Sequence, residues 1–335
     1  MPLVRRRRNR SPGSTSLRDH YERTAVGLLE ALSPISGLIA ANHDPGTFIY
    51  RGVGSSTYQL VPAAFRGRRL PFPDRRPVSR RTFHNQIWAE IVYFSEYCRV
   101  ADSRGLRIPE DSQAFRSILQ DLNGPDYIDR LSSGGAVWPP DGILSALGLA
   151  QHYGVPTRLL DWTRSPFVAA YFAATSSLQS PTPSRRAAIW AFDVDRLLLN
   201  TFNDLDLPES VRLVNAPGFD IPNLQAQQGL FMVVRGGKFR KSATFRVRPY
   251  DELLTSEVLM DSSGPVLYRF TFPGTEAPDL LRLLSYLGVD GSAIFPGHKG
   301  AAQAVSERLL WPPPGSKYEN RVMRAARRRF GAAWK

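Results

Sequence analysis

The sequence is poor in the residues and motifs on which several large protein classes depend. Its 335 residues include a single cysteine, Cys98, which excludes an internal disulfide and any cysteine-based metal site. The five histidines are scattered, without the spacing of a zinc site. The chain has no Gly-x-x-x-x-Gly-Lys-Ser/Thr, Gly-x-Gly-x-x-Gly, His-Glu-x-x-His or Gly-x-Ser-x-Gly motif. We therefore expect no metal, and none of the enzyme classes that these motifs define is indicated.

Long hydrophobic runs are also lacking. No uncharged apolar run approaches the ~20 residues that span a bilayer. Residues 25–41 follow an arginine run as a signal peptide would, but Glu30 and Pro34 interrupt them. We interpret the segment as part of an amphipathic helix, and we expect a cytoplasmic protein without a membrane partner.

Acidic residues are scarce relative to basic ones, and the imbalance lies at the two ends. The chain has 30 acidic and 43 basic residues, a net charge of +13, of which residues 1–18 and 317–335 contribute +6 each. Such basic ends can bring a protein to nucleic acid without reading its sequence. A solvated tail that aids solubility is the alternative. We divide the chain into a disordered basic tail (1–16), a folded body (17–311) and a basic C-terminal tail (312–335), for which a helix is one interpretation.

The 42% hydrophobic content is enough for a core, and its periodicity predicts an α+β fold. Helical spacing predicts helices over residues 17–41, 83–101, 110–122, 141–152, 166–174 and 277–287. Short apolar runs predict strands over residues 47–50, 158–162, 187–193, 230–235, 266–273 and 293–296. The helices between the first two strands form a helical insertion over residues 83–150.

Three segments contain candidate residues for a binding or catalytic site. In Phe48-Ile49-Tyr50-Arg51-Gly52, an arginine ends an apolar strand, and Gly52 allows another group to approach the backbone closely. The planar Arg51 guanidinium suits a phosphate or a ribose hydroxyl, and a pairing with a local carboxylate is the alternative.

The second segment, residues 149–166, concentrates polar groups around the apolar pair Leu159-Leu160. Polar residues at the end of a buried strand are a usual way to place binding groups. Individually, His152 can instead bond a backbone carbonyl, and Asp161 can cap the next helix. In the third segment, Gln227 precedes an apolar strand that begins after Gly229. Its side-chain amide can donate and accept hydrogen bonds at a nucleotide. The alternative is a loop glutamine that packs against its own strand.

These segments, in this order, resemble the FRG domain, a family named for its Phe/Tyr-Arg-Gly signature, here Tyr50-Arg51-Gly52. The block from Gln151 to Thr163 and the stretch from Gly288 to Gly300 also match, so the resemblance covers residues 45–305. It implies a single FRG domain. One departure is Asn223, which stands where members often carry an arginine.

A remoter similarity is to ADP-ribosyltransferases, and it implies a split, mostly antiparallel sheet with an NAD-binding cleft. Arg51 resembles the arginine of the first strand in those enzymes, and Gln227 stands where their catalytic glutamate would. The similarity implies NAD as substrate, with these site residues: catalytic Gln227 and Asp161, and cofactor-binding Arg51, His152, Thr157, Arg158, Trp162 and Thr163. We expect Arg51, His152, Thr157, Asp161, Thr163 and Gln227 to line one cleft.

A glutamine at position 227, in place of the catalytic glutamate of those enzymes, changes the electrostatics of the expected site. A neutral amide accepts a hydrogen bond from the ribose hydroxyl but supplies no full charge to the cation that forms when nicotinamide leaves. Losing one such electrostatic contribution costs ~3–4 kcal/mol. Two functions therefore stay open: an NAD- or nucleotide-binding ADP-ribosyltransferase-like enzyme or effector, suited to a toxin or phage-defence role in a bacterium, and a non-catalytic module that binds nucleic acid or a nucleotide.

Overall fold

The computed structural model describes residues 17–66, 81–179, 185–195, 209–215, 222–236, 243–255, 267–311 and 316–330. The expected disordered tail over residues 1–16 lies outside this part of the chain. Within it, no helix has both the length and the apolar character needed to cross a membrane.

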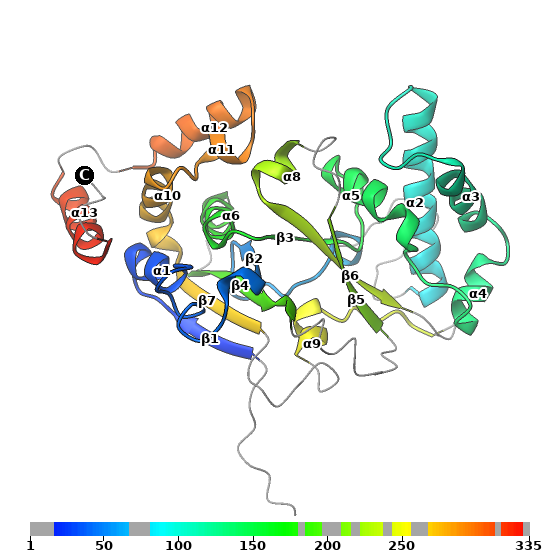
Figure 1. The fold of residues 1–335 in the computed structure, drawn as a ribbon, viewed down its shortest axis with the longest axis horizontal. Helices are drawn as coiled ribbons and strands as arrows, with labels where there is room; N and C mark the ends of the chain where they lie inside the picture. The colour runs from blue at the N-terminus through cyan, green and yellow to red at the C-terminus, as the bar shows by residue number, and fades with distance from the viewer. Residues whose placement is uncertain are drawn as a thin grey trace, which may run out of the picture.

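A seven-stranded sheet forms the centre of the described structure (Figure 1), with the order β1-β7-β4-β2-β3-β6-β5. The strands are β1 (Leu17–Tyr21), β2 (Phe48–Val53), β3 (Leu160–Thr163), β4 (Arg186–Asp193), β5 (Glu209–Val214), β6 (Gly229–Gly236) and β7 (Leu267–Pro273). Every neighbouring pair is antiparallel except β1 and β7, which are parallel. The predicted α+β class with a mostly antiparallel sheet is confirmed.

The sheet divides between β2 and β3. Six residue pairs join β2 to β4, whereas Tyr50 and Thr163 are the single pair that joins β2 to β3. Beyond that pair the two strands separate, and each half of the sheet continues on its own side. The division is where the predicted site residues of β2 and β3 lie.

Helices lie around both halves of the sheet. They are α1 (Ala25–Ala31), α2 (Phe83–Ser103), α3 (Gln113–Leu122), α4 (Tyr127–Ser133), α5 (Leu144–His152), α6 (Pro166–Gln179), α8 (Pro222–Ala226), α9 (Tyr250–Leu254), α10 (Ala277–Tyr286), α11 (Gly291–Ile294), α12 (His298–Arg308) and α13 (Lys317–Phe330). Several begin at a side chain that accepts a backbone N–H three residues on, as Thr24, Thr82 and Ser112 do for α1, α2 and α3.

Helix α6 packs on one face of the sheet, against Phe48 and Tyr50 of β2 and the inward residues of β4 and β7. Its small residues let it approach very closely. A Cβ at Gly52 would lie 1.9 Å from the carbonyl oxygen of Ala169 and 2.6 Å from the backbone nitrogen of Ala173. The expected close approach at Gly52 is therefore confirmed, and the approaching group is the backbone of α6.

Between β2 and β3 the described chain is helical, and α2, α3, α4 and α5 lie together at one end of the molecule (Figure 1). They share an apolar cluster that includes Phe94, Phe115, Trp138 and Leu147. A buried ion pair ties this block to the sheet: the Arg158 guanidinium donates to the Glu90 carboxylate at 2.7 and 3.0 Å.

Two predicted elements are wrong. Residues 17–21 form β1 instead of the start of a helix, because they pair with β7 and the helix begins only at Ala25. Residues 291–294 form α11 instead of a strand: Asp290 caps this short helix by accepting from the backbone nitrogens of Ser292 and Ala293.

Candidate ligand-binding site

Arg51 occupies the division of the sheet. Its Nη1 donates to the backbone carbonyl of Asp161 and lies 3.4 Å from the Asp161 carboxylate oxygen Oδ2. The side chain is 14% exposed. Its Nε is buried and has no hydrogen-bond partner among the described residues. The guanidinium therefore takes the place of a strand pairing between β2 and β3 and still keeps an unsatisfied donor.

Asp161 and its neighbours form a short hydrogen-bonded series on the segment that joins α5 to β3. Gln151 donates from Nε2 to Asp161 Oδ1 at 2.6 Å, and Thr157 donates from Oγ1 to Gln151 Oε1. The backbone N–H of Leu159 in turn donates to Thr157 Oγ1 at 3.1 Å. This series fixes the orientation of the Asp161 carboxylate, whose side chain is 62% exposed.

A pocket of about 190 Å³ opens beside this series. Its polar lining comes from Arg51, Arg66, Gln151 and Asp161. The pKa of Arg66 is lowered, first by desolvation and then by the positive charge of Arg51, while Asp161 acts in the opposite direction. Two guanidinium groups thus face one small space that holds a single, largely exposed carboxylate.

Two aromatic rings lie next to the pocket in the sequence. His152 and Tyr153 precede the lining residue Gly154, and their ring centroids are 5.1 Å apart. Tyr153 is 66% exposed. Desolvation lowers the pKa of His152, and Lys299 adds to this effect while Asp161 opposes it. The imidazole is therefore mainly neutral at pH 7.

Further unsatisfied donors lie on the same face of the sheet as Arg51. Trp190 of β4 is paired directly with Arg51, and Trp162 is adjacent to the residue that pairs with β2. Strand alternation places all three side chains on one face. Both indole Nε1 atoms, like Arg51 Nε, are buried without a partner among the described residues.

Gln227 and Thr163 lie together but outside the pocket lining. Thr163 Oγ1 donates to the Gln227 backbone carbonyl at 2.7 Å, and Gln227 Nε2 is 3.4 Å from the carbonyl oxygen of Ile294. The pocket of Arg51 and Asp161 is lined by neither of them. The structure therefore places the predicted residues in two groups, one around Arg51, Thr157 and Asp161 and the other around Thr163 and Gln227.

Two predicted binding residues lie in the core. Arg158 is bonded to Glu90, with side chains 6% and 4% exposed. Trp162 is 3% exposed and packs near Phe192. Sequence spacing could not separate Arg158 from Asp161, because only the direction of each side chain distinguishes them.

Two pocket residues were missed as site residues. Gln151 stands in the same polar block as the predicted site residues, so its position was a usable signal. Arg66 belongs to an arginine- and proline-rich segment with seven arginines between residues 66 and 81, and nothing in the sequence sets it apart from the others.

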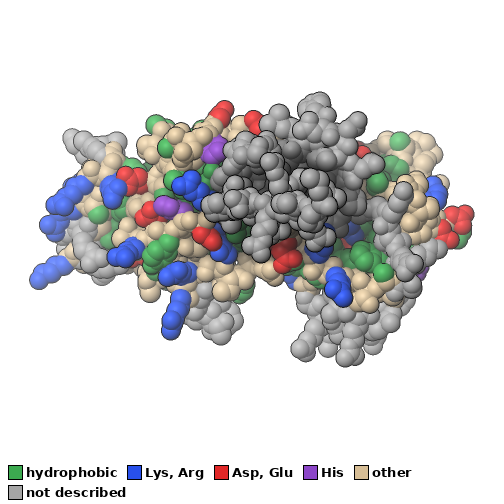
Figure 2. All heavy atoms as spheres, turned by 90° about the horizontal axis from the view of Figure 1, so that it is seen from below, with side chains coloured by type: hydrophobic (Ala, Val, Ile, Leu, Met, Phe, Trp, Pro, Cys, Tyr) green, Lys and Arg blue, Asp and Glu red, His purple; other side chains and the backbone are tan. Residues whose placement is uncertain are grey.

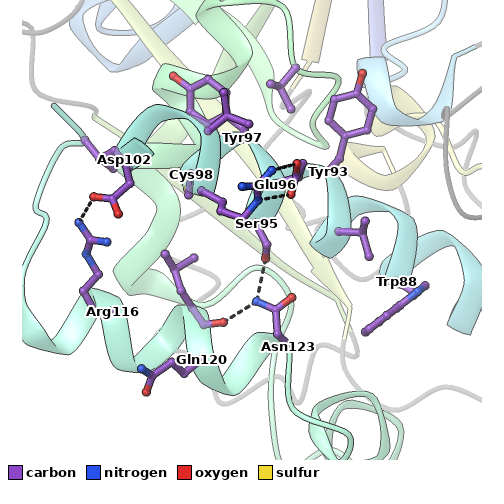
Figure 3. Close-up of a pocket in the computed structure, with 16 residues that line it drawn as sticks. Trp88, Tyr93, Ser95, Glu96, Tyr97, Cys98, Asp102, Arg116, Gln120 and Asn123 are labelled. Atoms are coloured by element: carbon purple, nitrogen blue, oxygen red, sulfur yellow. Dashed lines mark hydrogen bonds and ion pairs between the residues drawn. The ribbon is translucent and has the colours of Figure 1, made fainter. Parts of the chain in front are cut away.

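A larger pocket, of about 1290 Å³, lies between α2 and α3 (Figure 3). Its polar side chains are largely paired with one another: Arg116 bonds Asp102 at 2.7 Å, and Asn123 donates to Ser95 Oγ at 3.2 Å. Burial raises the pKa of the Cys98 thiol to about 12, so this cysteine is not a thiolate at neutral pH. The pocket offers volume but no set of reactive groups.

The described residues contain no group of three or more histidine, cysteine, aspartate or glutamate side chains that could hold a metal ion. Fold and site together define an α+β protein with a pocket lined by two arginines at the division of its sheet.

The chain carries an FRG domain. The family model described as FRG domain matches residues 126–181, a narrower range than residues 45–305. The match includes Gln151, Thr157 and Asp161, whereas Arg51 and Gln227 lie outside it. No curated protein and no solved structure matches the chain.

Proposed function

We propose that this FRG-domain protein binds a nucleotide in the pocket at the division of the sheet, with Arg51 and Arg66 contacting its phosphates. The observation that carries the proposal is the pair of guanidinium groups that line one pocket of about 190 Å³. Like charges in one desolvated space repel each other, and an anion relieves that repulsion. A planar guanidinium is also well suited to phosphate oxygens.

The unsatisfied donor supports the same conclusion. A buried N–H group without a partner carries a desolvation cost of about 1–3 kcal/mol. Arg51 Nε is such a group, so the hydrogen-bonding capacity of the Arg51 guanidinium is not fully used by the described residues. The volume accommodates a phosphate or ribose phosphate, so the rest of a nucleotide extends outward.

The Asp161 carboxylate and the exposed ring of Tyr153, which precedes the lining residue Gly154, offer the other contacts that a nucleotide needs. Asp161 is held by Gln151 and largely exposed, as an acceptor for ribose hydroxyls requires. Tyr153 presents an exposed ring on which a base can stack. NAD is the nucleotide that we propose. In the proposed reaction the bond between nicotinamide and the ribose C1′ breaks, nicotinamide leaves, and C1′ bonds to water or to a nucleophile of a target molecule. Such an activity would suit a toxin or phage-defence effector.

Binding is tested with the full chain by calorimetric titration of NAD and of ADP-ribose. We expect Arg51→Gln to weaken both Kd values at least tenfold, because a charged hydrogen bond contributes about 1.5–3 kcal/mol. Arg66→Gln, on a more exposed side chain, gives a second variant in case Arg51→Gln does not fold. The matched control is Arg269→Gln on β7, where the arginine pairs with Asp19 instead. Absence of binding by the wild type, or equal loss in the control, would contradict the proposal.

Catalysis is tested at Gln227. Gln227 does not line the pocket, so this part of the proposal requires the nicotinamide ribose to extend out of the pocket toward Thr163 and Gln227. There Gln227→Glu adds a charge that favours departure of nicotinamide, and we expect NAD cleavage to rise by about 10²–10³. Among the described residues the native side-chain amide donates over a long 3.4 Å to the Ile294 carbonyl, so a thermal melt must show that Gln227→Glu folds. Gln225→Glu, at an exposed position two residues earlier, controls for charge alone. A folded Gln227→Glu protein with unchanged release of nicotinamide would reject catalysis at this position and leave the binding proposal standing.

A further inference from the structure

The basic C-terminal segment is a docked helix. Helix α13 places Ala326, which is 0% exposed, in the cluster that also holds α1 and α10 residues. Val322, Met323 and Phe330 pack against the same cluster. The ion pair of Arg329 with Glu30 of α1 adds a polar contact at the edge.

Three exposed cations of α13 lie on the side opposite to that packed face. Lys317, Arg324 and Arg328 are exposed and separated by seven and four residues, so they lie close to one line along the helix. At 100° per residue, Ala326 points about 160° away from both Arg324 and Arg328. Arg327 is also exposed and borders this line. Burial of Ala326 therefore fixes the direction in which the arginines project.

The resulting surface is concentrated at one end of the molecule. Helix α13 forms that end in Figure 1, and in Figure 2 lysine and arginine side chains gather at the same end. The line from Lys317 to Arg328 covers eleven residues, or about 16 Å. One strand of a B-form duplex carries about five phosphates over that length.

We infer that α13 is a docking surface for the phosphate backbone of nucleic acid, without reading of base sequence. Nucleic acid is favoured over an anionic membrane because of where the apolar face of α13 lies. An amphipathic helix binds a bilayer by burying its apolar side in the lipid. In α13 that side is already packed on the protein, through Ala326, Val322 and Met323. The exposed, charged side faces away from the protein, and a polyanion is the partner whose charge complements it.

This surface is separate from the nucleotide pocket, because no α13 residue lines that pocket. Loss of nucleotide binding in the pocket would therefore leave nucleic-acid binding by α13 unchanged, and the reverse also holds. Binding of nucleic acid requires neither Arg51 nor Gln227.

The test measures binding of the full chain to a fluorescently labelled 25-base-pair DNA duplex, its RNA counterpart and phosphatidylserine-containing vesicles, over a range of salt concentrations. The variant carries Arg324→Gln, Arg327→Gln and Arg328→Gln, which leave the apolar face intact. We expect its Kd for the duplexes at low salt to be at least tenfold weaker. We also expect the slope of log K against log salt to fall by about 2–3, since each lost phosphate contact removes about 0.9.

The matched control removes three exposed arginines from the helical block at the other end, by Arg99→Gln, Arg104→Gln and Arg107→Gln. A control that binds like the wild type supports the inference. Equal losses in both variants would mean that net charge alone acts, and the inference would be overturned. It is also overturned if the α13 variant keeps the wild-type affinity and slope, or if the wild type binds the vesicles and neither duplex.

Discussion

Two arginines of this chain have opposite roles although both stand beside polar motif residues. Arg51 lies in the gap between two strands with an unsatisfied Nε, whereas Arg158 is fully engaged with Glu90 in the core. Trp138 Nε1 and Gln86 Nε2 also donate to Glu90, at 3.0 and 2.9 Å. Hydrogen bonds thus satisfy both buried charges, and they connect α2 to the start of β3.

Removal of one charge from this buried pair tests its importance. We expect Glu90→Gln to lower the free energy of unfolding by about 3–5 kcal/mol, because the buried Arg158 cation loses its counter-charge. Urea unfolding followed by circular dichroism measures the change. Glu96→Gln, on the same helix but in an exposed pair with Arg99, is the matched control and should unfold close to the wild type. Similar midpoints for the two variants would show that the buried pair does not stabilise the fold.

At the scale of elements, the contact between β2 and α6 positions the site. The glycine that follows Arg51 lets the helix backbone lie against the strand. Gly54 makes the same kind of contact, since a Cβ there would lie 2.6 Å from the backbone carbon of Ser176. The start of α6 follows directly after β3, so its position also fixes the residues of that strand. A displaced α6 would move Arg51 and Asp161 relative to each other.

We expect Gly52→Ala to destabilise the protein by about 3 kcal/mol, the upper end of the usual cost of overpacking a core. The new methyl group would meet backbone atoms of α6, which cannot rotate away as a flexible side chain would. Thermal unfolding measures the loss. Gly135→Ala is the control, because its Cβ would have no neighbour closer than 3.6 Å. An unchanged melting temperature for Gly52→Ala would contradict the close packing.

At the scale of the whole molecule, the excess positive charge lies at the ends of the chain and not in the folded body. The body between the basic ends carries a net charge of about +1, and the C-terminal arginines are held at one end by a packed helix. The pocket lies instead at the division of the sheet, where β3 leaves the helical block. Within the part of the chain that the structure describes, the small cationic pocket of Arg51 and Arg66 is thus separate from the broad, exposed cationic surface of α13.

Much of this architecture could be predicted from the sequence. Local periodicity located α2, α3, α6, α10 and most strands, because a helix or strand with one buried face shows its period directly. The polar block around Asp161 indicated the FRG domain and lies within the matched residues 126–181, whereas Arg51 lies outside them. Both segments were predicted as strands, and these two strands meet at the pocket. Binding of NAD, its cleavage and the likeness to ADP-ribosyltransferases stay predictions.

Tertiary structure alone decided the rest. Residues 17–21 have a helical spacing, but pairing with β7, which begins at Leu267, about three quarters of the chain length away, makes them a strand. Arg158 and Asp161 are three positions apart, yet one side chain enters the core and the other faces the pocket. Arg66 reaches the site from a segment whose sequence resembles a loop. In each case the deciding interaction joins residues distant in sequence, and no local pattern records which distant partner a residue will meet.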